Sequence, residues 1–144
     1  TKRTAPVKIA YLSNNFREWF LSGDGKIEEP ISEQTLRYAK LRKYSVDGFI
    51  ITELGGEAKA ETTLTEIFSL MEKQKNGEAS GLLTNGYANI FYVRDALLVL
   101  RAVDVNSYRD GWGVLAHSVD NPSGWSGGYR VFSRNSLCSV PVTV

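Results

Sequence analysis

The chain contains one histidine, His117, and one cysteine, Cys138, and these two side chains limit the chemistry that it can perform. Zinc sites take their ligands from several Cys, His and carboxylate side chains, so one residue of each type does not supply the usual set. A Cys–His nucleophile requires His117 and Cys138 to meet, and a buried cysteine and a hydrogen-bonded strand histidine are the simpler interpretation. We therefore expect no metal and no cofactor.

A second candidate site is acidic, because Asp47 is followed ten residues later by Glu57-Ala58-Lys59. This spacing resembles the divalent-metal site of the PD-(D/E)xK nucleases. The resemblance implies that the two carboxylates hold Mg²⁺ and that Lys59 helps to activate water. It covers about thirteen residues, and it departs from the family's pattern because Glu57 follows Gly55-Gly56 and lies on a loop or at the approach to a helix. The alternative interpretation is a solvated, charged connection.

Arginine supplies every basic residue after Lys75. Its planar guanidinium grips carboxylates and phosphates and stacks on rings, which lysine does less well. The C-terminal half also contains strand-like segments in which side chains alternate between two faces. We predict that the amphipathic face and the adjoining loop bind a partner through seven residues: Arg101, Arg109, His117, Trp125, Arg130, Phe132 and Arg134. In the alternative interpretation, these arginines pair with Asp104, Asp110 and Asp120, and the apolar residues pack under the helices.

Because successive side chains of a strand alternate between the two faces of a sheet, the residue numbers of the expected strands assign each side chain to one face. We predict a core face made of Leu98, Leu100, Ala102, Trp112, Val114, Ala116, Tyr129 and Val131. The opposite, amphipathic face then holds Val99, Arg101, Val103, Leu115, His117, Val119, Arg130, Phe132 and Arg134. A register error of one residue would dissolve this cluster, because it moves every side chain of a strand to the other face.

The stretch 120–128 is rich in glycine and turn-forming residues, yet it contains Trp125. An exposed tryptophan there is a stacking platform for a sugar, a base or a partner. A tryptophan that folds back is instead a lid over the core. The glycines allow both conformations.

Periodicity and turn chemistry place the elements that would position these residues. We predict a strand at 7–12, a helix at 15–22 capped by Asn14 or Asn15 (alternatively a strand at 16–21), a helix at 33–44 and a strand at 49–54. The capping box Thr63-x-x-Glu66 begins a helix that ends before Asn76-Gly77. Strands follow at 87–94, 97–105, 112–119 and 129–134, and the second and third form a hairpin around Arg109-Asp110-Gly111.

Helices thus gather in the first half and strands in the second, which indicates an α+β fold. We expect a mainly antiparallel C-terminal sheet of about four strands, one or two N-terminal strands, and two or three helices packed on it. The 144 residues are expected to form a single domain, 1–144, since no linker or repeat divides them.

Bulk composition narrows the class of protein. The net charge of +1 argues against a domain that coats nucleic acid by electrostatics alone. No apolar run reaches the roughly 18 residues that a membrane span needs. The N-terminus has no signal-peptide core, so we expect a cytoplasmic protein without membrane contact.

Three functions remain open on these observations. The leading hypothesis is a non-enzymatic binding or accessory domain, with a protein or polyanion as partner and nucleic acid left open. The alternatives are a Mg²⁺-dependent nuclease that uses Asp47, Glu57 and Lys59, and a self-associating structural protein that forms a homo-oligomer through aromatic side chains and strand edges.

Overall fold

The computed structural model describes residues 8–23, 25, 28, 35–75, 81–120, 123–134 and 140–143. Its helical segments are α1 (Asn14–Phe16), the π-helical segment η1 (Arg17–Leu21), α2 (Asp47–Glu53), α3 (Glu57–Ala60) and α4 (Leu64–Lys75). Its strands are β1 (Ile9–Leu12), β2 (Thr35–Lys40), β3 (Glu61–Thr62), β4 (Asn89–Arg94), β5 (Leu100–Tyr108), β6 (Gly111–Ser118), β7 (Arg130–Ser133) and β8 (Val140–Thr143).

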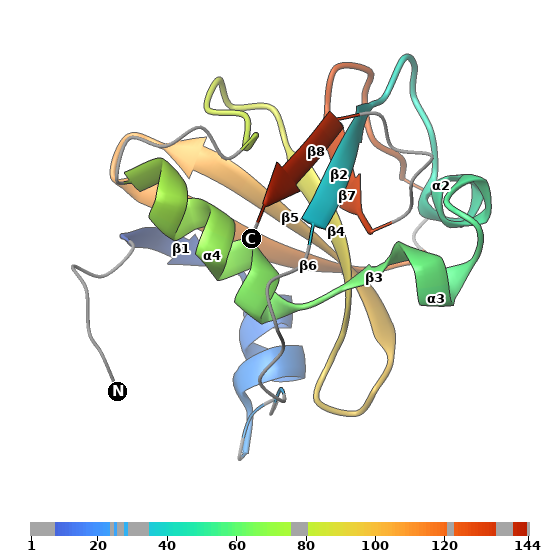
Figure 1. The fold of residues 1–144 in the computed structure, drawn as a ribbon. Helices are drawn as coiled ribbons and strands as arrows, with labels where there is room; N and C mark the ends of the chain where they lie inside the picture. The colour runs from blue at the N-terminus through green and yellow to red at the C-terminus, as the bar shows by residue number, and fades with distance from the viewer. Residues whose placement is uncertain are drawn as a thin grey trace.

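The described strands form one mixed sheet (Figure 1). The order along the sheet is β1–β6–β5–β4–β7–β2–β8, and the short β3 pairs with β4 outside this path. Strands β4, β5 and β6 are antiparallel neighbours, and β2 is antiparallel to both β7 and β8. The pairs β1–β6, β3–β4 and β4–β7 are parallel. β4 is therefore central: β5 lies along one edge, and β7 and then β3 lie along the other.

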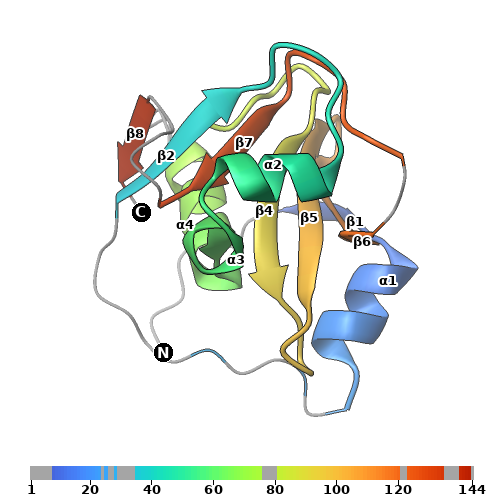
Figure 2. The same ribbon diagram turned by 90° about the vertical axis from the view of Figure 1, so that its right-hand side faces the viewer.

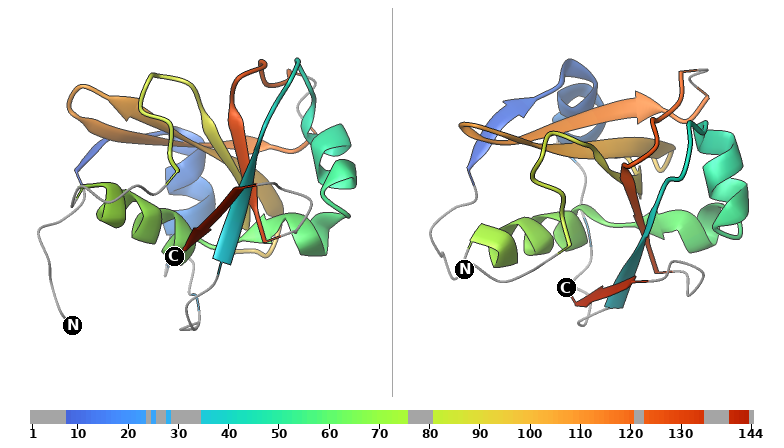
Figure 3. Two further views of the ribbon diagram at one scale, coloured as in Figure 1. Left: turned by 45° about the horizontal axis from the view of Figure 1, so that its top comes forward. Right: turned by 90° about the horizontal axis from the view of Figure 1, so that it is seen from above.

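Both faces of the sheet are covered by helices, so β4 is apolar and buried on both sides. Figures 2 and 3 show α2 and α4 on opposite sides of β2 and β7. The α4-side core joins α1, η1 and α4 to residues such as Phe91, Val103 and Phe132. The α2-side core joins α2 and α3 to residues such as Ile90 and Tyr92.

The predicted α+β class is confirmed, and so are the elements whose signals are local. The helix predicted at 15–22 is present as α1 and η1, although Ser13 caps it instead of Asn14 or Asn15, because the Ser13 hydroxyl accepts a hydrogen bond from the Phe16 N–H at 3.1 Å. The strands predicted at 87–94, 112–119 and 129–134 are β4, β6 and β7 with small changes at their ends. The predicted β5–β6 hairpin is also confirmed, since Tyr108 pairs with Gly111.

The sheet itself differs from the predicted one. It is mixed and larger than the expected antiparallel set of about four strands, because β7 does not follow β6 in a meander. Instead β7 crosses to the far side of β4 and pairs with it in parallel, next to β2. The bounds of β5 also differ: a turn at 95–98, in which Leu98 has a φ of 67°, precedes the strand, which begins at Leu100 and continues to Tyr108.

Two predicted elements are wrong. Residues 35–40, within the helix predicted at 33–44, form strand β2, in which Leu36 and Tyr38 point to the α4-side core at a spacing of two. Residues 49–54, predicted as a strand, belong to helix α2 and its end. Ile50, Ile51 and Leu54 lie on one helical face and are buried there, whereas Phe49 is 55% exposed.

Side chains that accept hydrogen bonds from backbone N–H groups fix the N-terminus of α4. The predicted capping box is confirmed, because the Glu66 carboxylate accepts from the Thr63 N–H at 2.9 Å and the Thr63 hydroxyl accepts from the Glu66 N–H at 3.2 Å. Glu28 accepts from the N–H groups of Leu64 and Thr65 at 2.7 and 2.9 Å. Glu66 is only 1% exposed, and Arg134 donates to both of its oxygens, at 3.0 and 2.7 Å.

The Glu66–Arg134 pair gives a test of this arrangement. We expect Arg134→Ala to lower the free energy of unfolding by about 1.5–3 kcal/mol, because it removes charge-assisted hydrogen bonds from a carboxylate that stays buried. Urea titration measures the loss. Arg134→Lys keeps the charge but cannot donate to both carboxylate oxygens in the same geometry. Its free energy of unfolding should lie between those of the unmodified protein and Arg134→Ala. An unchanged unfolding midpoint for Arg134→Ala would contradict the assigned pair.

Candidate functional site

The segment 41–46, which we call the linker, connects β2 to α2, and the Trp125 loop (123–129) lies along it. Ser45 of the linker and Trp125 of the loop exchange two backbone hydrogen bonds, of 3.0 and 2.8 Å. Closer to β2, Leu41 forms two more with the other end of the loop, both of 2.8 Å. The loop thereby extends the antiparallel pairing of β2 with β7 and fixes the position of the linker.

Buried polar side chains lock the two segments together. Asp47 begins α2 and is 1% exposed, and its Oδ1 accepts hydrogen bonds from the Tyr92 hydroxyl and the Trp125 indole N–H, both at 2.7 Å. The Trp125 ring meets His117 edge-on, with 5.4 Å between centroids. His117 Nε2 lies 2.6 Å from Oδ2 of the buried Asp104. We call these five residues the latch. Trp125 is therefore a lid that folds back, the second of the two conformations that its glycines allow.

The environment of the latch shifts the pKa values of its groups. Burial raises the pKa of the Asp47 carboxyl, and the hydrogen bonds from Tyr92 and Trp125 offset only part of this effect. Burial and then the charge of Asp47 raise the pKa of Tyr92, so its hydroxyl stays a donor. The hydrogen bond to Asp104 raises the pKa of His117 above its ordinary value of 6.5, against the effect of burial.

The polar groups of the latch bind one another. Among the residues that the structure describes, no hydroxyl or thiol forms a hydrogen bond with His117. The Asp47 oxygen that two donors occupy is out of contact with water. These groups therefore position the linker and the Trp125 loop.

A cavity of about 270 Å³ opens beside the latched linker, between β2 and α2. In Figure 2, α2 crosses in front of the sheet and the linker joins it to β2. The floor of the cavity is apolar and consists of Ala39, Leu41, Ile50, Leu54 and Val131. We call this cavity, with its rim, the β2–α2 groove. Phe49 stands at its edge with 55% of its surface exposed.

The rim of the β2–α2 groove is basic. Lys40, Arg42 and Lys43 line it and are exposed, and Glu53 is the one acidic residue among the lining side chains. Within the described part of the chain, none of the three cations forms an ion pair. Three positive charges around an apolar floor suit a ligand that carries negative charge and apolar groups together.

The structure gives internal partners to two of the arginines predicted to bind. Arg101 pairs with Asp95 at 2.9 Å and stacks on Trp19 with its guanidinium carbon 3.6 Å from the ring centroid. Arg134 pairs with Glu66 at 2.7 Å. Both arginines thus pair within the chain, but their partners are not the three aspartates of the alternative interpretation.

The remaining predicted residues lie in different places. Arg130 covers the Tyr38 ring at 4.0 Å, and Phe132 is fully buried and stacked on Phe91. Arg109 is exposed in the β5–β6 turn. The structure therefore does not bring the seven residues together on one surface. Their role in binding stays a prediction.

The predicted division of the sheet into two faces is also wrong. Ala102 pairs with His117, and Val103 pairs with Ala116, so each pair shares a face. The tight β5–β6 turn sets this register, because it pairs even-numbered residues of β5 with odd-numbered residues of β6. Arg101 consequently lies on the face opposite to His117.

The acidic constellation is spread over two helices. Asp47 is buried in the latch, whereas Glu57 is exposed at the start of α3 and pairs with Arg94 at 3.2 Å. Lys59 is exposed on α3. In the described ranges, no group of three or more His, Cys, Asp or Glu residues is placed to hold a metal ion. Cys138, the other half of the Cys–His hypothesis, lies outside the described residues.

The groove was missed at the sequence level although part of its signal is visible. Lys40-Leu41-Arg42-Lys43 is a dense basic run, but the prediction of a helix at 33–44 spreads these charges around a cylinder. Phe49 was assigned to a buried strand. Recognising the groove requires the long-range contact between α2 and the sheet, which no local pattern encodes.

No protein-family model, no curated protein and no solved structure matches this chain. None of the helices in the described ranges is long and apolar enough to cross a membrane.

Asp47 gives a direct test of the latch. We expect Asp47→Ala to lower the free energy of unfolding by about 2–4 kcal/mol, because each buried donor left without an acceptor costs about 1–3 kcal/mol. Asp47→Asn keeps a carbonyl oxygen for Tyr92 and Trp125 and removes a buried charge. Its free energy of unfolding should therefore decrease clearly less than that of Asp47→Ala. Urea unfolding followed by tryptophan fluorescence measures both. Equal losses would show that Oδ1 does not hold the two donors.

The latch also predicts a pH dependence of stability. The folded-state pKa of His117 is raised, so its stabilising effect is fully present below 6.5 and is lost as pH rises through the raised value. The raised pKa of Asp47 acts in the same direction. We expect stability to fall from about pH 6 to 8, and to fall less in His117→Gln. Urea midpoints across this range measure the difference, and identical slopes would exclude His117 as the titrating group.

Proposed function

We propose that this domain is a non-enzymatic binding module, and that the β2–α2 groove binds an acidic polypeptide segment that also carries apolar side chains. One observation carries the proposal: Lys40, Arg42 and Lys43 stand without ion-pair partners in the described part of the chain, around an apolar floor. Surface cations placed this way attract and orient a negatively charged partner. The floor gains free energy from apolar side chains that it removes from water.

Exposed apolar side chains extend the groove outward. Tyr44, Val46 and Phe49 are 58%, 37% and 55% exposed and belong to the linker and α2. Aromatic residues beside cations are typical of the energetic centre of protein–protein interfaces. This surface is the feature that favours a polypeptide ligand.

Charge distribution favours a polypeptide over a nucleic acid. The net charge of the chain is +1, and the groove combines its three cations with Glu53. Proteins that follow a phosphate backbone present a broader basic stripe. A short acidic segment needs fewer cations, and its apolar residues match the floor.

The latch supports the proposal by keeping the groove preformed. Asp47 ties the start of α2 to β4 and to the Trp125 loop, so both walls of the groove are held before a ligand arrives. Preorganisation of this kind reduces the entropy lost on binding.

The experiment uses fluorescence anisotropy with a labelled peptide of alternating Glu and Leu. Peptides in which Lys replaces Glu, or Ser replaces Leu, test the charge and the apolar part separately. We expect the Glu-Leu peptide to bind most tightly, and R42E/K43E to weaken it at least tenfold, about 1.4 kcal/mol. The control R17E/K59E makes the same change of charge at two exposed positions outside the groove and should bind like the unmodified protein.

Four outcomes would contradict the proposal. The Glu-Leu peptide could fail to bind, or the two double variants could weaken it equally. Salt-sensitive binding of heparin or RNA without peptide binding would instead identify a polyanion partner. Concentration-dependent self-association that R42E/K43E abolishes would identify a second copy of the chain as the occupant.

A further inference from the structure

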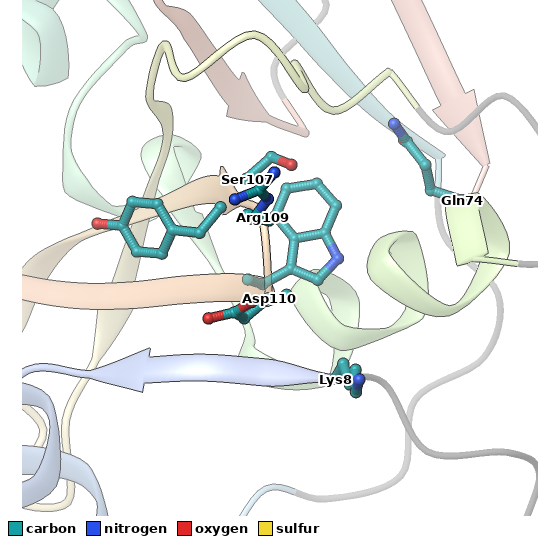
Figure 4. Close-up of a pocket in the computed structure, with 8 residues that line it drawn as sticks. Lys8, Gln74, Ser107, Arg109 and Asp110 are labelled. Atoms are coloured by element: carbon teal, nitrogen blue, oxygen red, sulfur yellow. The ribbon is translucent and has the colours of Figure 1, made fainter.

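A second cavity, of about 350 Å³, lies at the end of the β5–β6 hairpin, and we call it the hairpin-end pocket. Residues from three separate segments line it: Lys8 before β1, Gln74 in the last turn of α4, and 107–112 of the hairpin. In Figure 4, Lys8 and Gln74 lie on one side, and Ser107, Arg109 and Asp110 lie on the other. Its volume falls within the range of small-molecule sites.

Backbone contacts fix the walls of this pocket. The Trp112 N–H donates to the Lys8 carbonyl at 2.9 Å, which holds the start of β1 against the hairpin. Gly111 makes this approach possible, because its φ is +138° and a Cβ there would lie 2.5 Å from the Lys8 oxygen. The Gln74 amide donates to the Leu82 carbonyl at 3.1 Å. The pocket is therefore built by interactions between segments far apart in the sequence.

The lining residues combine a ring with cations. Ser107 and Trp112 are a cross-strand pair, so the hydroxyl and the indole stand on the same face. Lys8 and Arg109 are exposed and have no ion-pair partner within the described ranges, and Asp110 is the one acidic lining residue. Tryptophan offers a flat apolar surface, and the guanidinium and ammonium groups attract an anion.

We propose that the hairpin-end pocket binds a small aromatic anion, with its ring against Trp112 and its charged group between Lys8 and Arg109. This site is independent of the β2–α2 groove, since the two cavities share no lining residue. Ser107 adds a hydroxyl that donates to the anionic group. The domain then responds to a small molecule at one site and to a polypeptide at the other.

Isothermal titration calorimetry with 1-naphthyl phosphate tests the site, with 1-naphthol and inorganic phosphate as probes that each keep half of the ligand. We expect naphthyl phosphate to bind at least tenfold more tightly than either half. The variants K8Q and R109Q change exposed side chains outside the cores, and each should weaken binding at least fivefold. K59Q removes one charge at an exposed position outside both cavities, and this matched control should leave the binding unchanged.

Several outcomes would overturn the proposal. Absence of naphthyl phosphate binding would do so, as would equal binding of 1-naphthol, which would show that the cations take no part. Unchanged affinity in both K8Q and R109Q would place the probe elsewhere. Loss of naphthyl phosphate binding in R42E/K43E would place it in the β2–α2 groove. Loss of peptide binding alone leaves the hairpin-end pocket standing, so failures of the two sites are distinguishable.

Discussion

One carboxylate oxygen joins three parts of this molecule that are distant in sequence. Oδ1 of Asp47 accepts from Tyr92 in the central strand and from Trp125 in the glycine-rich loop, and Asp47 itself begins α2. Because this oxygen is shielded from water, both hydrogen bonds have to be present in the folded state. The start of α2, the linker and the Trp125 loop therefore cannot move independently. A network with every member satisfied favours a single arrangement over its alternatives.

The central strand imposes the second constraint. β4 is buried on both faces because α4 packs on one side of the sheet and α2 on the other. This layered arrangement separates the two cavities. The β2–α2 groove lies on the α2 side, whereas the hairpin-end pocket lies at the far end of β5 and β6, next to the end of α4. Each cavity is built from a different set of long-range contacts.

Sequence reasoning succeeds where the determining contacts are local. The Thr63–Glu66 capping box and the β5–β6 turn are each determined by residues close together in the sequence, and both are present. It fails at β2, whose conformation depends on two strands from the other end of the chain. It fails again at α2, where β-branched residues read as a strand although their helical spacing lets the sheet bury them. The α+β class survives these errors because helix and strand exchange places in the same half.

For the sites, residue type was informative and residue position was not. The arginines do make the ring and carboxylate contacts that their chemistry favours, but with Asp95, Glu66 and Trp19 of the same chain. The face assignment depended on the register of the β5–β6 hairpin. The observed register differs by one residue from the predicted one, so Arg101 and His117 lie on opposite faces. The basic run 40–43 was visible from the start, yet its meaning depends on the floor that α2 and β7 place beneath it.

The position of β2 has a consequence for the protein as it is being made. Both of its neighbours, β7 and β8, come from the far end of the chain, so β2 leaves the ribosome long before either of them. Until then both of its edges are open, and an open strand invites pairing with other chains. Arg37, Lys40, Arg42 and Lys43 lie within and directly after this strand. Charged residues in such places oppose aggregation. The cations that line the β2–α2 groove thus also stand where they oppose aggregation of an unfinished chain.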